Sequence, residues 1–189
     1  MVRWALISGE SGVENADLAL SVVARLESAR VRTAGFVQHK WRNESGEKRY
    51  ELVRLHHDEK TILAVDGVAA KGPNEEFFCS MAFHNEGFDA ALRWIREDLA
   101  GADLVLLDGI SKLEVSGKGH SATLEHALRH SDALVLICVR ASQLSYVMER
   151  FALSDEGLVA ALELPADESA LDGFVGDLRA SCHGQRANR

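Results

Sequence analysis

The chain has 189 residues, a hydrophobic content of 47% and only two prolines, which predicts a single globular domain and excludes a disordered chain. Its formal net charge of −8 at pH 7 argues against nucleic acid or anionic membranes as partners. No apolar run approaches the ~20 residues that a membrane helix needs, and the N-terminus lacks the apolar core of a signal peptide, so a cytoplasmic location is expected.

Short apolar runs and amphipathic segments alternate along the chain. Strands are predicted at residues 3–7, 31–38, 49–55, 61–65, 104–107, 133–139 and 158–162. Helices are predicted at residues 17–28, 85–100, 121–130, 142–153 and 168–181. This alternation indicates an α/β fold with a three-layer, mainly parallel sheet, and the central strands predict an antiparallel hairpin insertion. Residues 71–81 are expected to be irregular, and a single domain at 1–182 to be followed by a flexible tail at 183–189.

A glycine-containing loop, residues 8–16, joins the first predicted strand to the first helix. This is the context of a Walker A loop, in which glycine N–H groups surround phosphate, a lysine neutralises it and a hydroxyl reaches Mg²⁺. Aligned with Gly-x-x-Gly-x-Gly-Lys-Thr/Ser, the loop keeps Gly9 and Gly12 but has Glu14, Asn15 and Ala16 at the last three positions. The lysine and the metal-binding hydroxyl are therefore both missing from the pattern.

The charge of Glu14 opposes phosphate binding. Two like charges ~4 Å apart repel by about 4 kcal/mol at an effective dielectric constant of about 20, whereas a helix N-terminus attracts an anion by only ~0.3–1 kcal/mol. Binding of an ordinary triphosphate is therefore predicted to be weak. In the alternative interpretation, the two glycines only make a tight turn and Asn15 or Asp17 caps the helix.

A second motif begins with the apolar run 104–107, which ends in Asp108 and is followed by a polar loop with Lys112 and Glu114. A buried strand that ends in a carboxylate is how P-loop enzymes position the acid that holds Mg²⁺. Asp108 is therefore a candidate metal ligand and catalytic residue, and Glu114 is a second catalytic candidate. Mg²⁺ is expected only together with a bound nucleotide. Alternatively, Asp108 caps the loop, and Lys112 and Glu114 form a structural ion pair.

Ligand-binding candidates lie in the segments that follow several of the predicted strands. They are Gly9, Glu10, Ser11, Gly12, Asn15, Lys112 and Arg140. Residues 38–40, Gln-His-Lys, leave the second strand at the same predicted edge and are weaker candidates. His120 lies near the loop mouth. It and the other histidines, including a pair at i, i+4 spacing, are expected to lie on the surface rather than to bind a metal.

The acid-bearing segment resembles that of the thermostable nucleoside-triphosphatase family, which reads apolar-Asp-Glu-Ile-Gly-Lys-Met-Glu where residues 107–114 read Leu-Asp-Gly-Ile-Ser-Lys-Leu-Glu. A closer resemblance is to bacterial domain-of-unknown-function family 2478. It rests on Gly-x-x-Gln at 35–38, Lys-x-Glu-x-x-Gly-x-Gly at 112–119 and Leu-Pro at 164–165. Together the resemblances imply a fold of the P-loop NTPase type with an eroded phosphate loop. Members of the second family often lie near genes for molybdenum handling, which implies an accessory role there.

The chain departs from the triphosphatase pattern at three positions. Gly109 replaces an acid that in that family is a candidate for polarising the attacking water, while Asn15 and Ala16 replace the lysine and the hydroxyl. The leading interpretation is a ligand-binding or accessory protein with a degenerate nucleotide site, which binds a nucleotide or another small anion. Two alternatives stay open: an active nucleoside-triphosphatase with a non-standard cation, and a protein-interaction module, such as a homodimer formed through residues 71–84.

Overall fold

The computed structural model describes residues 2–10, 12–42, 44, 46–66, 75–78, 80–130 and 132–186. The strands in this part of the chain are β1 (Trp4–Gly9), β2 (Thr33–Arg42), β3 (Lys48–Arg54), β4 (Lys60–Asp66), β5 (Glu75–Phe78), β6 (Met81–His84), β7 (Leu104–Ile110), β8 (Leu134–Arg140) and β9 (Leu158–Glu163). The α-helices are α1 (Gly12–Ser28), α2 (Asn85–Asp98), α3 (Lys112–Val115), α4 (Ser121–His130), α5 (Leu144–Phe151) and α6 (Glu168–Arg186).

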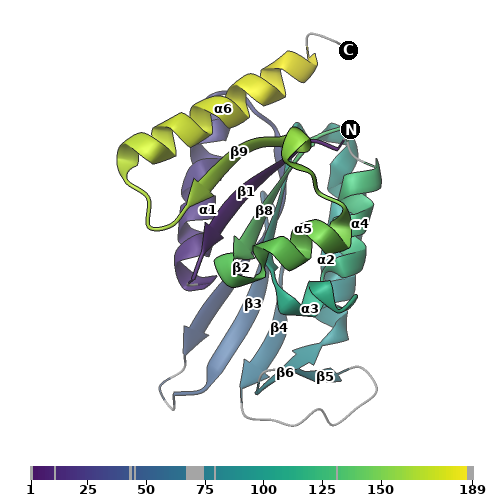
Figure 1. Ribbon diagram of the computed structural model, residues 1–189. Helices are drawn as coiled ribbons and strands as arrows, with labels where there is room; N and C mark the ends of the chain where they lie inside the picture. The colour runs from purple at the N-terminus through teal and green to yellow at the C-terminus, as the bar shows by residue number, and fades with distance from the viewer. Residues whose placement is uncertain are drawn as a thin grey trace.

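All of these strands belong to one sheet with the order β5-β6-β4-β3-β2-β7-β8-β1-β9. Neighbouring strands from β2 to β9 are parallel, and those from β2 to β5 are antiparallel. The predicted α/β fold with a parallel sheet and an antiparallel insertion is therefore confirmed. The insertion is larger than a hairpin, because β5 and β6 extend it (Figure 1).

The central strands are apolar on both sides because helices cover both faces of the sheet. On β8, Leu134 and Leu136 belong to a core that they share with α1 and α6. Val135 and Ile137 alternate with them and belong to a second core, shared with α2, α4 and α5. The sheet is thus the middle of three layers, with α1 and α6 on one side and the shorter helices on the other (Figure 1).

Helix α1 begins at Gly12 rather than at the predicted residue 17. Asn15 and Asp17 lie inside the helix, so the interpretation of either as its cap is wrong. Only two residues, 10 and 11, separate β1 from α1 in the sequence.

Two other segments differ from the prediction. Within the stretch expected to be irregular, residues 75–78 form β5, which pairs with β6; residues 71–74 lie outside the described part of the chain. The polar loop after β7 contains helix α3. Helix α6 continues to Arg186 and so includes residues 183–186, which the sequence assigned to a tail. No helix among the described residues has both the length and the apolar character for a membrane crossing.

Candidate functional site

A small cavity of about 100 Å³ lies at the carboxyl ends of the central parallel strands. Its lining residues are Gly9, Gln38, Lys40, Tyr50, Asp108, Gly109, Ile110, Ser111, Cys138 and Arg140. This edge is where open α/β sheets bind their ligands. A water molecule occupies ~30 Å³ in the liquid, so the cavity has room for a phosphate-sized group but not for a nucleoside.

Asp108 is the acid in this cavity, and its side chain is only 2% exposed. The backbone N–H of Gln38 donates a hydrogen bond of 2.9 Å to its Oδ2 atom. Burial raises the pKa of Asp108 to about 6, although hydrogen bonds from the N–H groups of Gln38 and Gly109 and from the Cys138 thiol oppose the shift. No ion pair neutralises Asp108 within the described residues. A buried carboxylate therefore faces the cavity without a cationic partner of its own.

Two basic side chains line the same cavity. Arg140 is the last residue of β8, exposed, and lies beside Gly9 in the parallel register. Lys40 comes from β2, and its Nζ atom lies 5.7 Å from the centre of the Tyr50 ring. The cavity thus combines two cationic side chains with the acid of Asp108. An anion that carries a divalent cation would meet charges of both required signs.

The side chains around Asp108 fit Mg²⁺ only in combination with phosphate oxygens. No cluster of three or more His, Cys, Asp or Glu ligands occurs in the described ranges. Ala16, at the position of the metal-binding hydroxyl, is a buried residue of α1. Mg²⁺ is commonly held by one or two carboxylates together with substrate phosphates and water. Asp108 is therefore the residue that would hold the ion, provided that a bound phosphate group supplies further ligands.

Gly109 has a backbone that favours glycine. Its φ is +85°, and a Cβ atom built there would lie 2.4 Å from Oε1 of Gln38. The pairing register of β7 with β8 shifts at this point, between Leu107 and Ile110. An L-residue in the left-handed region is strained by roughly 1–2 kcal/mol. The position next to Asp108 is therefore shaped for glycine and not for an acid.

Glu114 is buried and fixes the start of α3 and the loop after it. Its Oε2 atom accepts the N–H of Ser111 at 2.8 Å, and its Oε1 atom accepts the N–H of His120 at 2.9 Å. Burial raises the pKa of Glu114 to about 7, with these backbone N–H groups acting in the opposite direction. Lys112 is exposed, and the predicted Lys112–Glu114 ion pair does not occur among the described residues.

The structure brings some of the predicted ligand-binding residues together. Gly9 and Arg140 line the small cavity, and Lys112 joins Arg140 in the larger cavity described next. Glu10 is exposed and lines neither of these two cavities. Ser11 lies outside the described residues, as do the side chains of residues 12–15, so the predictions for Gly12, Glu14 and Asn15 stay predictions.

A larger cavity of about 280 Å³ adjoins the first and shares several lining residues with it, among them Gln38, Tyr50 and Arg140. Its further lining is mainly apolar and aromatic, with Leu63, Phe78, Met81, Phe83, Phe88 and Leu113. Leu63, Phe83 and Phe88 belong to the core on the α2 side of the sheet or pack against it. The larger cavity therefore opens from the phosphate-sized one toward the layer that does not contain α1.

His120 lines the larger cavity and is only 1% exposed, so the prediction of a surface histidine is wrong. Its ring lies between those of Phe36 and Phe88, with centroid distances of 4.7 and 4.8 Å. Its position just before α4 carries no periodic signal of burial, and the inward orientation depends on the bond from its N–H to Glu114. Burial lowers the pKa of His120 to about 3, so its imidazole is neutral at physiological pH.

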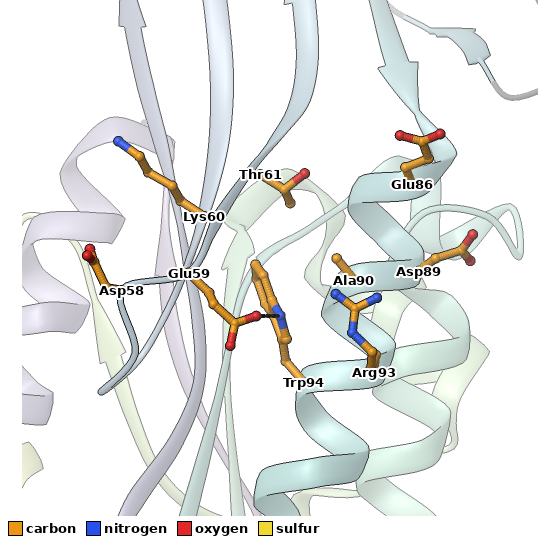
Figure 2. A pocket seen from close by; sticks show the side chains of 9 residues that line it. All are labelled: Asp58, Glu59, Lys60, Thr61, Glu86, Asp89, Ala90, Arg93 and Trp94. Atoms are coloured by element: carbon orange, nitrogen blue, oxygen red, sulfur yellow. Dashed lines mark hydrogen bonds between the residues drawn. The ribbon is translucent and has the colours of Figure 1, made fainter.

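A third depression, of about 610 Å³, lies where the turn before β4 meets α2 (Figure 2). Here Glu59 accepts a hydrogen bond from Nε1 of Trp94 at 2.9 Å. Glu59 also pairs with Arg54, whose guanidinium bonds Asp98 at 2.6 Å and is only 5% exposed. These groups bind one another and hold α2 against the sheet. The polar side chains of this network therefore have a structural role.

The strand order, the short connection between Gly9 at the end of β1 and Gly12 at the start of α1, and the buried acid at the end of β7 together define an α/β domain of the P-loop NTPase type. The chain belongs to the NTPase family, whose model matches residues 5–165. The predicted relation to the thermostable nucleoside-triphosphatases is confirmed at this level.

Individual relatives agree with this assignment. The chain is 24% identical over 131 residues to nucleoside-triphosphatase THEP1 of Methanocaldococcus jannaschii. The aligned residues make up 68% of this chain and 74% of that protein. A solution structure of a human cancer-related nucleoside triphosphatase has a TM-score of 0.69 at 15% identity and covers 96% of this chain and 98% of that one. The crystal structure of THEP1 from Aquifex aeolicus has a TM-score of 0.65 at 17% identity, and the match covers 92% of this chain and 95% of that one. These two structures support the fold.

Proposed function

We propose that this chain is a P-loop NTPase-like ligand-binding or accessory protein with a degenerate nucleotide site. It holds a nucleotide or another phosphate-bearing small anion at the carboxyl edge of the sheet and hydrolyses it at no more than background rate. The observation that carries the proposal is the backbone of Gly109. At φ +85° and against Gln38, this position supplies no acid to polarise a water molecule beside Asp108.

The parts that remain are suited to binding. Arg140 and Lys40 offer positive charge to an anion, and Asp108 would hold an accompanying Mg²⁺. The parts that are missing, at Asn15, Ala16 and Gly109, are those that neutralise the β- and γ-phosphates, complete the metal site and prepare the attacking water. Weak binding without turnover follows from this selective loss.

Two measurements on the purified chain test the proposal. Phosphate release from ATP, GTP, CTP and UTP with Mg²⁺ is expected to equal that of the Asp108→Ala variant. Clear turnover that vanishes in Asp108→Ala would overturn the proposal. Binding is read from the thermal shift with each nucleotide, because a ligand at about 100 times its Kd adds about 2.7 kcal/mol of stability.

The anion site is tested by comparing Arg140→Ala with Arg129→Ala. Both replace an exposed arginine, but Arg129 lies on α4 and has a side chain 70% exposed. Loss of one well-placed charge weakens binding by about tenfold, which corresponds to 1.4 kcal/mol. We expect this loss for Arg140→Ala alone, and equal affinities of the two variants for ATP and for tripolyphosphate would contradict the assignment.

A second candidate function is an active nucleoside-triphosphatase in which Arg140 replaces the missing lysine. It is favoured by the position of Arg140, which pairs with Gly9 in the sheet and lines both cavities. It differs from the first proposal in predicting turnover that both Asp108→Ala and Arg140→Ala abolish and that Arg129→Ala leaves intact.

We also propose a closer kinship with family 2478, supported by the motifs at residues 35–38, 112–119 and 164–165, and an accessory role in molybdenum handling. Growth and molybdoenzyme activity of a deletion strain test that role, and normal activity under molybdate limitation would contradict it. The cytoplasmic location and a homodimer through residues 71–84 stay predictions; light scattering of the full chain tests the dimer.

A further inference from the structure

Three polar side chains meet at the amino edge of the sheet, away from the two cavities at the carboxyl edge. Glu27 lies in the last turn of α1, Thr33 is the first residue of β2, and His56 lies in the turn between β3 and β4. Thr33 pairs with Leu104, the first residue of β7, whereas Asp108 lies toward the other end of that strand. Three separate elements thus bring their polar groups to one place.

The ligating atoms of these side chains form a close triangle. Oγ1 of Thr33 lies 2.6 Å from Oε1 of Glu27 and 2.7 Å from Nε2 of His56. Nε2 of His56 lies 2.8 Å from the same Oε1 atom. A hydroxyl carries one hydrogen, an imidazole nitrogen carries at most one, and an ionised carboxylate carries none. Hydrogen bonding therefore leaves one of these close contacts without a hydrogen of its own.

A metal ion would satisfy all three atoms at once. Nitrogen and oxygen ligands bind a divalent transition metal at about 2.0–2.2 Å, which places two ligand atoms at right angles about 3 Å apart. The triangle would have to open by only a few tenths of an ångström. The side chains of His56 and Glu27, 43% and 37% exposed, have room for this movement and leave an entry path for the ion and for further water ligands.

The charges around the triangle favour a cation. Glu27 lies in the last turn of α1, where the negative end of the helix dipole disfavours a carboxylate and attracts a positive charge. Two arginines close to it in sequence are held by other acids: Arg25 pairs with two acidic residues of α6, and Arg32 pairs with Asp103. A bound divalent ion would therefore neutralise a carboxylate that its own helix destabilises.

We propose that Glu27, Thr33 and His56 form a binding site for a divalent transition metal ion, with Zn²⁺ as the expected occupant. The imidazole ligand favours Zn²⁺ over Mg²⁺, which prefers oxygen ligands. The ion would connect the end of α1 to β2 and to the turn after β3, so its binding stabilises the fold. This inference is independent of the proposed function, because none of the three residues lines either cavity at the carboxyl edge.

Isothermal titration of the metal-free full chain with Zn²⁺ and with Mg²⁺, in the absence of nucleotide, tests the proposal. Zn²⁺ is expected to bind and to raise the melting temperature, and Mg²⁺ is expected to bind at least about tenfold more weakly. Absence of Zn²⁺ binding, as when protonated His56 only forms an ion pair with Glu27, would overturn the proposal. Equal affinity for the two ions would contradict the role of the imidazole.

His56→Asn locates the ion. The backbone φ of His56 is +63°, a conformation that asparagine adopts more readily than most residues, so the variant loses the imidazole and keeps the turn. It is expected to bind Zn²⁺ at least about tenfold more weakly. The matched control is His57→Asn, because His57 is 44% exposed and its Nε2 atom lies near Asp98 instead. An equal loss of affinity in both variants would refute the assignment.

Two further variants cover the case in which His56→Asn does not fold. Glu27→Gln removes the charged ligand, and Thr33→Val removes the hydroxyl from a side chain of similar shape; each is expected to weaken Zn²⁺ binding, whereas Asp108→Ala is not. Paramagnetic Co²⁺ should broaden the amide NMR signals of residues 27, 33 and 56 before that of residue 108. Zn²⁺ affinity that these two variants leave unchanged, as when the ion is held by the exposed histidines of α4 or at the carboxyl edge, would contradict the proposal.

Discussion

Glu114 offers a quantitative test of how burial sets the electrostatics of this site. Its carboxylate is 2% exposed and receives two backbone N–H bonds, yet burial raises its pKa from 4.5 to about 7. A carboxyl whose pKa is higher in the folded protein binds its proton more tightly there than in the unfolded chain. Its ionisation therefore destabilises the fold, and the loss grows as the pH rises from about 4.5 through about 7.

The magnitude follows from the two pKa values. The rise of the pKa from 4.5 to about 7 corresponds to about 3 kcal/mol, at 1.36 kcal/mol for each pKa unit. Between about pH 5 and about pH 8.5, roughly 2–3 kcal/mol of this loss develops, because the unfolded side chain is already partly ionised at the lower pH. Glu114→Gln removes this contribution. It also leaves an amide NH₂ facing a backbone N–H, which lowers stability by about 1–3 kcal/mol at every pH.

Urea unfolding of both proteins at the two pH values separates these effects. The difference in stability between Glu114→Gln and the parent should move by roughly 2–3 kcal/mol in favour of the variant between about pH 5 and about pH 8.5, whatever its constant offset. Glu156→Gln, at an exposed carboxylate, should show no such movement. An offset that stays the same at both pH values would refute the reasoning that Glu114 ionises against a desolvation penalty.

The other predictions concern backbone shape and ion pairing. Gly109→Glu, which restores the acid of the family pattern, should lower stability by about 1–2 kcal/mol because of its positive φ and should not raise phosphate release in a turnover assay. Gly119→Ala should destabilise the protein by about 2 kcal/mol in urea unfolding, because its φ is +60° and its Cβ would lie 2.2 Å from Oε1 of Glu114; an unchanged midpoint would contradict the contact. Arg54→Met leaves Asp98 without its bonded cation and should lower stability by about 3 kcal/mol, or roughly 6–12 °C in Tm; a loss below about 1 kcal/mol would place the network among weak surface pairs.

The elements with strong hydrophobic patterns could be predicted from the sequence. The run 133–139 is apolar at nearly every position, which is typical of a strand buried on both faces, and it forms β8. The helices at 85–100 and 121–130 were found because their apolar residues recur at helical spacing, and they correspond to α2 and α4. Errors arose at the ends of elements, as at the start of α1, because hydrophobic periodicity does not mark the residue at which a helix begins.

The site was only partly predictable, since its contacts connect residues far apart in sequence. Asp108 was found because a carboxylate that ends an apolar run is a local signal. The burial of His120 has no local signal, since it depends on a turn closed by the side chain of Glu114 and on rings contributed by β2 and α2. Likewise, the role of Gly109 depends on the β7 register shift and on contact with Gln38 from a neighbouring strand.

Two buried polar side chains at the carboxyl edge of the sheet, Asp108 and His120, lower the stability of the ligand-free protein. Asp108 has no ion pair, and His120 has no hydrogen-bond partner, in the described part of the chain. His120, as an unsatisfied buried group, lowers the stability of the ligand-free protein by about 1–3 kcal/mol. Asp108 accepts hydrogen bonds from Gln38, Gly109 and Cys138, and its cost comes from the desolvation of its charge. Apolar side chains of similar size would avoid that loss. Asp108 and His120 line two adjoining cavities that share Gln38 and Arg140. A cation bound at this edge would pair with the Asp108 carboxylate, and a hydrogen-bonding group would pair with the His120 imidazole, so a bound ligand would recover stability at the same groups that lower it.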